Sequence, residues 1–211
     1  MAQIAYTLSY NIEGKTYSQN GIVTGEMEVE RKKDNFPAAK DAVLSTRTDN
    51  DTGVLTFTTN PGLSVGDRID VYWNGGARRT MKVSNITGTG PYLITIGTGS
   101  GDVGVGDVLP AQDAVITVGI VQGFDFPVVG NNVKGLLASC AAKGTIILCS
   151  GVAGSEVEEW AAVFESGAGV KAWTSDSDAA NPITGDTITR VLMSHGDSTG
   201  TREVKVSALV A

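Results

Sequence analysis

The sequence predicts a mainly all-β fold: a β-sandwich with one short helix and a small inserted β-barrel-like domain. Short segments with apolar residues at every second position recur along the chain, as is typical of strands with one buried face. Glycine supplies 27 of the 211 residues, about twice the usual share of roughly 7%. These glycines gather with threonine between the apolar segments, where they indicate many turns and short strands.

The first alternating segment is residues 4–12, IAYTLSYNI. Its large apolar positions are Ile4, Tyr6, Leu8, Tyr10 and Ile12. A turn signal at residues 13–15 and a second strand region ending near residue 30 complete a predicted N-terminal hairpin. An unpaired sheet edge is a liability for a monomer, but in an assembling protein it can join neighbouring copies. We therefore treat Ile4, Tyr6, Leu8 and Tyr10 as a candidate interface.

Residues 46–112 have the pattern of a compact run of short strands, which suggests a small barrel-like domain. One alternating strand is predicted at residues 69–73, and Asn74-Gly75 follows it directly. This dipeptide is a strong hairpin signal, because a type I′ turn needs positive φ angles. We expect residues 1–45 plus 113–211 to form the sandwich, with 46–112 inserted. Two domains in series is the alternative.

Residues 132–143 predict the short helix. Their apolar positions follow the spacing i, i+3, i+4, i+7, which places them on one face of a helix. These positions are Val133, Leu136, Leu137 and Cys140. Asn132 fits an N-cap and Gly144 fits the residue after the last helical turn.

Residues 155–164 leave two interpretations open. Ser155 and Glu158 match a helix capping box, whereas the all-β context favours a strand. The rest of the C-terminal half predicts strands at residues 115–121, 145–150, 170–173, 187–193 and 204–209.

The charge balance is acidic, with 16 basic and 23 acidic residues and a net charge of −7. This argues against a dedicated nucleic-acid binder, which needs a basic patch to neutralise phosphates. The N-terminus shows no secretory signal pattern, and no apolar run approaches the roughly 18 residues of a membrane span. We expect no membrane partner and a protein that is made and assembled in a cytoplasm.

Residues that carry chemistry are few. The single histidine, His195, has Ser194 and Asp197 beside it, but members of a catalytic triad meet across a fold rather than within one loop. We expect His195 to be a turn residue after a strand. Cys140 and Cys149 lie in apolar surroundings and are expected to be buried thiols. The sequence therefore predicts no enzyme and no zinc site.

A dinucleotide-binding motif occurs in the sequence, but the residues around it do not fit a cofactor site. The motif G-x-G-x-x-G at residues 99–104 is not followed by a helix, so we expect no cofactor. Acidic loops leave weak Ca²⁺ binding open. The loop beginning at Asp49 resembles half of an EF-hand loop, but its twelfth position is Asn60 where that motif has an acidic residue. The acidic loop positions are Asp49, Asp51, Asp102, Asp107, Asp176 and Asp178.

Three further residues are candidate interface positions. Arg78 and Arg79 could contact an acidic neighbouring subunit, and a solvated strand edge is the alternative. Trp73 could be an interface anchor or a core residue. One of the adjacent residues Tyr72 and Trp73 must face outward from the strand, and an exposed aromatic side chain would favour glycan binding.

Several stretches resemble virion structural proteins of tailed bacteriophages. IAYTLSYNIEGKTYSQNGIVTG resembles their first hairpin, and GLSVGDRIDVYWNGGARRTMKV resembles a small barrel module that they often carry. ANPITGDTITRVLMS and VKVSALV are similar to the closing strands of phage β-sandwich subunits. The resemblance implies a tail tube subunit forming stacked rings around DNA, or a head decoration protein that clamps the capsid. Its partners would be copies of itself and other virion proteins, in a virion assembled in the bacterial host cytoplasm. A carbohydrate- or cell-surface-binding module is the alternative from another class.

Overall fold

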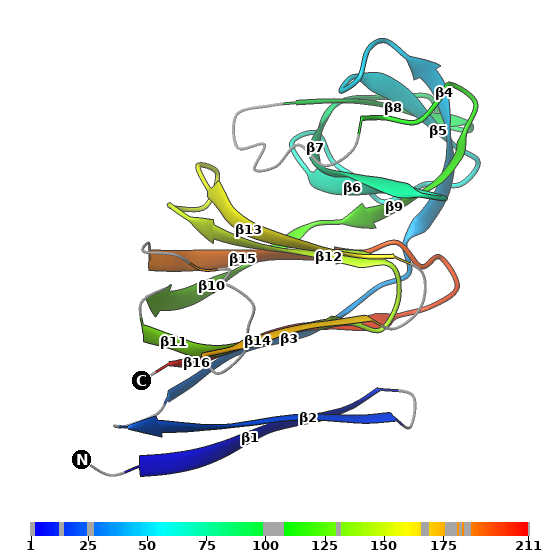
Figure 1. Cartoon of the computed structure of the whole chain (residues 1–211). Coiled ribbons are helices and arrows are strands. Elements are labelled where there is room, and N and C mark those ends of the chain that lie inside the picture. Colours follow the sequence, from blue (N-terminus) through cyan, green and yellow to red (C-terminus); the bar gives the residue numbers. More distant parts are fainter. Residues whose placement is uncertain are drawn as a thin grey trace.

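The computed structural model of the chain describes residues 3–12, 15–24, 28–98, 108–129, 132–165, 169–175, 181, 183 and 187–210. Side chains are described from Phe36 onward, apart from Val129. Within these ranges the chain forms strands β1 to β16 and no α-helix (Figure 1). The predicted mainly all-β fold is confirmed.

Six strands close into an antiparallel barrel in the order β4-β5-β8-β7-β6-β9. They are β4 Lys40–Arg47, β5 Gly53–Phe57, β6 Arg68–Trp73, β7 Gly76–Thr87, β8 Tyr92–Gly97 and β9 Val115–Ile120. Alternate side chains, such as Leu55, Ile69 and Val118, fill the interior as in other small barrels. Because β4 pairs with β9, the barrel strands span residues 40–120, a wider stretch than 46–112.

Two four-stranded antiparallel sheets form the sandwich. The first has the order β10-β15-β12-β13, and the second has the order β14-β11-β16-β3. Their strands are β3 Glu28–Phe36, β10 Gln122–Val129, β11 Val133–Cys140, β12 Gly144–Ser150, β13 Val157–Phe164, β14 Gly169–Thr174, β15 Thr187–His195 and β16 Arg202–Val210. Apolar residues of both sheets, such as Phe126, Ile146, Leu136 and Val206, meet in one core between them.

The predicted helix at residues 132–143 is wrong, because this segment contains strand β11. β11 is buried on both faces: Leu136 and Ala138 face the sandwich core, whereas Leu137 and Ser139 face the opposite side. A strand buried on both faces shows a continuous apolar run, and such a run can match helical spacing by coincidence. The open question at residues 155–164 resolves as strand β13.

The N-terminal hairpin is present, formed by β1 Gln3–Ile12 and β2 Lys15–Thr24. Its register runs from Ile12 opposite Lys15 to Gln3 opposite Thr24. The two strands form a sheet of their own within the part of the chain that is described. The return strand ends earlier than expected, because Glu28 already begins β3 and belongs to the sandwich.

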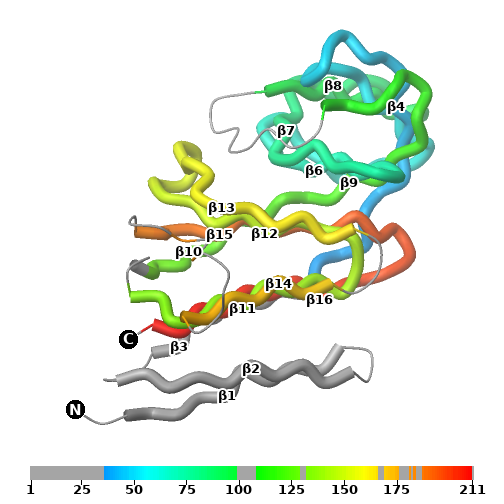
Figure 2. The backbone as a smooth tube through the Cα atoms, in the orientation of Figure 1, coloured from blue at the N-terminus to red at the C-terminus, as the bar shows by residue number. Residues whose placement is uncertain are grey.

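The barrel lies against the outer face of the β10-β15-β12-β13 sheet (Figure 1). The chain crosses from sandwich to barrel through residues 37–39 and returns through Val121, as the tube in Figure 2 shows. The barrel and the sandwich therefore meet along a junction that is bordered by both chain crossings.

Candidate functional site

The junction between barrel and sandwich holds the densest set of buried polar groups among the described residues. It begins in β6, where Ile69 and Val71 face the barrel core. Asp70 and Tyr72 alternate with them, so they point out of the barrel toward the sandwich. Both are fully enclosed, at 0% and 1% exposure.

Asp70 accepts hydrogen bonds from both domains. One carboxylate oxygen, Oδ1, accepts from the backbone N–H of Thr80 at 2.6 Å. The other, Oδ2, accepts from the hydroxyls of Thr145 and Ser194, on β12 and β15, and from Tyr72 at 3.2 Å. A buried carboxylate is tolerable only when hydrogen bonds replace its hydration, and here four donors do so. Asp70 therefore ties a barrel strand to two sandwich strands.

Tyr72 closes this network from the barrel side. Its hydroxyl lies within hydrogen-bond distance of Ser194 and of Thr145, the latter at 3.3 Å. Burial, followed by the charge of Asp70, raises the pKa of Tyr72 well above its usual value near 10. The phenol therefore stays protonated and serves as a hydrogen-bond donor.

Ion pairs continue the junction beyond Asp70. Arg68 of the barrel contacts Glu156 at 2.9 Å, and Arg190 of β15 contacts the same carboxylate at 3.2 Å. Arg190 also reaches Asp125 at 2.7 Å. Burial alone would raise the pKa of Glu156, but the hydrogen bond from Arg68, backbone N–H groups and the Arg68 charge lower it below its usual value. Glu156 therefore remains ionised between two arginines.

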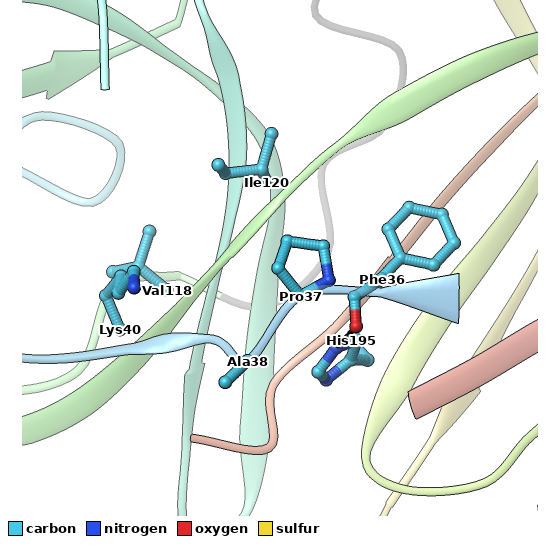
Figure 3. Close-up of a pocket in the computed structure, with 7 residues that line it drawn as sticks. All are labelled: Phe36, Pro37, Ala38, Lys40, Val118, Ile120 and His195. Atoms are coloured by element: carbon cyan, nitrogen blue, oxygen red, sulfur yellow. Dashed lines mark hydrogen bonds between the residues drawn. The ribbon is translucent and has the colours of Figure 1, made fainter. Parts of the chain in front are cut away.

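His195 is buried at the end of β15, beside the first chain crossing. The expectation of a turn residue is therefore wrong. Its Nε2 lies 3.1 Å from the Phe36 carbonyl, a contact drawn in Figure 3, and the backbone N–H of Asp197 donates to Nδ1 at 3.1 Å. This pattern fits a neutral ring with the proton on Nε2, and burial lowers the pKa of His195.

A small cavity adjoins His195, between the first crossing and β9 (Figure 3). It is lined by Phe36, Pro37, Ala38, Lys40, Val118, Ile120 and His195. Its volume of about 30 Å³ corresponds to roughly one water molecule in the liquid. The cavity is too small for an organic substrate.

A larger open cleft of about 300 Å³ lies where the rim of the barrel meets the sandwich. Its lining residues are Tyr72, Trp73, Asn74, Val115, Ile116, Thr117 and Lys143. The ammonium group of Lys143 donates to the Trp73 carbonyl and lies 3.8 Å from Glu165. This volume is at the lower end for small-molecule pockets, and the lining offers no nucleophile with an adjacent base.

The candidate interface residues lie in different environments. Arg78 is 1% exposed, contacts Asp51 at 3.2 Å and donates to the Arg79 carbonyl. Arg79 is also buried and contacts Glu158 of the sandwich at 3.2 Å. Neither arginine lies on a solvated strand edge, and each is already paired within the chain.

The aromatic pair is likewise turned inward. Trp73 packs partly buried against the barrel core, while Tyr72 is covered by the sandwich. The remaining candidates, Ile4, Tyr6, Leu8 and Tyr10, lie on β1, whose side chains are outside the described part.

Ser194, His195 and Asp197 do not form a catalytic triad. The Ser194 hydroxyl is directed to Asp70, whereas the His195 ring is directed to Phe36 and to the backbone of Asp197. Cys140 and Cys149 are free and buried, as predicted, and burial raises their pKa values to about 11 and about 12. Thiols with such pKa values are poor nucleophiles near neutral pH.

The acidic loops show no cluster of cation ligands in the described ranges, where no group of three His, Cys, Asp or Glu side chains could hold a metal. Asp49 accepts from the Asp51 backbone N–H and the Thr52 hydroxyl, while Asp51 pairs with Arg78. The positions Asp102, Asp107, Asp176 and Asp178, and the motif at residues 99–104, lie outside the described residues.

Sequence reasoning missed the junction, although a signal was present. Asp70 interrupts the apolar strand at residues 69–73, and Thr145 and Ser194 border strongly apolar runs. A polar residue next to a buried run needs a hydrogen-bond partner, and three such residues in three strands could have been matched to one another.

Comparison with known proteins identified no match among family models, curated proteins or solved structures. No helix long and apolar enough to cross a membrane occurs among the residues that the structure describes.

Proposed function

We propose that this protein is a non-enzymatic structural subunit of a tailed-phage virion, and specifically the major tail tube protein that forms stacked rings around the DNA channel. The observation that carries the proposal is the N-terminal hairpin. β1 and β2 pair with each other and with no further strand in the described ranges. An isolated two-stranded hairpin is marginally stable in water, so this element needs a partner.

The chemistry of the junction supports a structural function. Asp70, Thr145 and Ser194 are buried and bonded to one another, so no substrate reaches them. Arg68 and Arg79 are engaged with sandwich carboxylates. These groups hold two domains in one orientation, which suits a subunit that must present the same surfaces in every copy.

The charge of the chain agrees with this function. A net charge of −7 per subunit would give a ring an acidic character, along which DNA can slide without sticking. The partners would be copies of the chain and other virion proteins, and assembly would take place in the bacterial host cytoplasm.

A head decoration protein is the second candidate. The barrel lies on one outer face of the sandwich (Figure 1), where it would suit a knob on a capsid surface. The glycan-binding alternative has weaker support, because Tyr72 is buried and Trp73 is only partly exposed, although both line the open cleft.

Negative-stain electron microscopy of the concentrated protein tests the proposal. Hollow tubes or stacked rings are expected. Tyr6→Asp should abolish them, because Tyr6 belongs to the apolar positions of the first strand, while Thr7→Asp at the neighbouring polar position should retain them. Discrete particles from the wild-type chain would contradict the tube, and binding of these particles to undecorated capsids would establish the decoration protein instead.

A further inference from the structure

The turn between β6 and β7 presents an Asn-Gly pair to solvent. Trp73 and Gly76 are paired at the ends of the two strands, so Asn74 and Gly75 alone form the turn. Both turn residues are exposed, and Gly75 has a φ of +93°, a conformation that favours glycine. A Cβ on Gly75 would meet no atom within 4 Å, so the space beside its backbone is open.

The Asn74 side chain is free to move within this turn. In the part of the chain that the structure describes, no hydrogen bond holds its amide. The side chain lines the open cleft together with Lys143, where solvent reaches it. An unrestrained amide next to an open glycine nitrogen has the two groups that a ring closure needs, on adjacent residues.

The other exposed asparagines in the described ranges lack this combination. Asn50 accepts a hydrogen bond at 2.6 Å from the arginine that ends β4. Asn60 precedes Pro61, whose nitrogen carries no proton. Asn85 and Asn132 each precede a β-branched residue, whose side chain crowds the nitrogen that would have to attack.

The Asn-Gly dipeptide occurs once more, in β2. Asn20 and Gly21 lie opposite Thr7 and Tyr6 in the ladder of the N-terminal hairpin. Ring closure needs a rotation of the backbone after the asparagine, and a paired strand must open before this rotation can occur. The fold therefore places one copy of the dipeptide in an open turn and the other in a ladder.

We propose that Asn74 is a site of self-modification, at which the chain converts its own asparagine into aspartate and isoaspartate. Hydroxide from the solvent removes the N–H proton of Gly75, and the nitrogen attacks the side-chain carbonyl carbon of Asn74. A new C–N bond closes a five-membered imide ring. The bond to the side-chain nitrogen breaks, and this nitrogen takes a proton from water and leaves as ammonia, which regenerates hydroxide.

Water then opens the ring at one of its two carbonyl groups. Opening at the side-chain carbonyl gives aspartate in a normal chain. Opening at the backbone carbonyl gives isoaspartate, in which the chain runs through the side chain and is one atom longer. Neither step oxidises or reduces any group.

The product changes the charge of the cleft. Lys143 is the one charged residue among the residues that line it, and its ammonium group already lies 3.8 Å from Glu165. A carboxylate at position 74 adds a second negative charge near this cation. Isoaspartate also lengthens a turn of only two residues, so the ends of β6 and β7 must shift. The inference does not depend on the proposed self-assembly.

Timed peptide mapping of the full chain tests the proposal. The protein is incubated folded, and in parallel unfolded in urea, at neutral and at mildly alkaline pH. Trypsin releases residues 69–78, in which Asn74 is the single side-chain amide. This peptide should yield separate aspartate and isoaspartate forms, more rapidly at alkaline pH. Folding should slow the reaction by less than about fivefold at Asn74 and by more than that at Asn20.

Three results would overturn the proposal. They are a larger slowing at Asn74, a folded-state rate at Asn20 that equals or exceeds the rate at Asn74, and aspartate without isoaspartate, which would indicate direct hydrolysis.

Asn74→Gln is the matched variant, because it keeps an amide in the turn but would have to close a six-membered ring. Its peptide should remain unmodified over the same time, whereas modification at the wild-type rate would contradict the ring closure. Asn85→Gln, at an exposed asparagine of β7, should leave the rate at Asn74 unchanged. Circular dichroism checks that each variant keeps its strands.

Discussion

The two outer faces of the sandwich are both buried, but by different chemistry. The face under the barrel presents Thr145, Arg190 and Ser194, which make directional bonds to Asp70, Glu156 and their neighbours. The opposite face presents leucine and serine side chains, such as Leu137 and Ser207. Directional polar bonds specify a single orientation of the covering element. Apolar packing is not directional and stabilises any covering element of matching shape.

This difference separates a face whose cover is fixed by directional bonds from a face whose buried side chains are mainly apolar. The barrel is attached through two chain crossings and a buried network, so it cannot move without exposing Asp70. On the opposite face, no comparable polar network occurs among the side chains that the structure describes. The following changes test the fixed side of the comparison, in order of decreasing expected effect.

Asp70→Ala should have the largest effect, because it removes an acceptor shared by four donors. The expected loss in the free energy of unfolding is roughly 3–5 kcal/mol, since hydrogen bonds to a charged group contribute about 1.5–3 kcal/mol each and do not add fully. Urea denaturation measures it. Asp41→Ala, an exposed aspartate of β4, should change stability by less than about 0.5 kcal/mol. Equal losses would show that Asp70 is not a special attachment point.

Gly119→Ala tests the fit between barrel and sandwich. A Cβ on Gly119 would lie 2.2 Å from the His195 carbonyl oxygen, so backbone on one side must shift. We expect a loss of about 2–3 kcal/mol from this overpacking. Gly97→Ala is the control in another barrel strand, where the nearest atom is 3.6 Å away. If thermal melting shows both variants to be equally stable, β9 and the end of β15 are not tightly packed.

Glu156→Gln should weaken the ion-pair part of the junction by about 1–2 kcal/mol, because it removes the charge shared by Arg68 and Arg190. The folded-state pKa of Glu156 lies below the ordinary 4.5. Its contribution is therefore present above about pH 4.5 and is lost as the pH falls through the folded-state value. Denaturation curves at about pH 7 and pH 4 measure both effects. Glu165→Gln, at an exposed carboxylate, should match the wild type.

His195 should give the smallest and most specific effect. Burial lowers its pKa below the ordinary 6.5, so the unfolded chain binds a proton that the folded chain does not. Stability is present above about pH 6.5 and is lost as the pH falls toward the folded-state pKa, by about 1.4 kcal/mol per pH unit at most.

His195→Gln should lower stability at neutral pH and remove this slope between about pH 6.5 and pH 5. The neighbouring Asp197 does not titrate in this pH range, since hydrogen bonds from Thr199 and Arg202 lower its pKa to about 2. An unchanged slope in the variant would assign the pH dependence to other groups.

Most strands could be predicted from alternation and turn residues alone. Ile69 and Val71 alternate with Asp70 and Tyr72, and Asn74-Gly75 ends the strand, as the fold confirms. The wrong prediction of a helix around Leu136 and Leu137 has a physical cause. A strand covered on both faces loses its alternation, so its pattern no longer distinguishes strand from helix.

The junction depends on information that lies far apart in the chain. Asp70 meets Thr145 and Ser194 across 75 and 124 residues, and no local pattern encodes such pairings. The same holds for Arg79, for which the sequence left open a contact with another subunit or a solvated strand edge, and which pairs with Glu158 of its own sandwich.

The sequence by itself determined most of the strands, the barrel-like character of the middle region and the burial of the cysteines, because these follow from local periodicity and composition. The tertiary structure decided which strands are covered on both faces and which polar side chains form hydrogen bonds or ion pairs with one another. The physical reason is that a local pattern records only whether a residue avoids water. Which element excludes that water depends on how distant strands pack together.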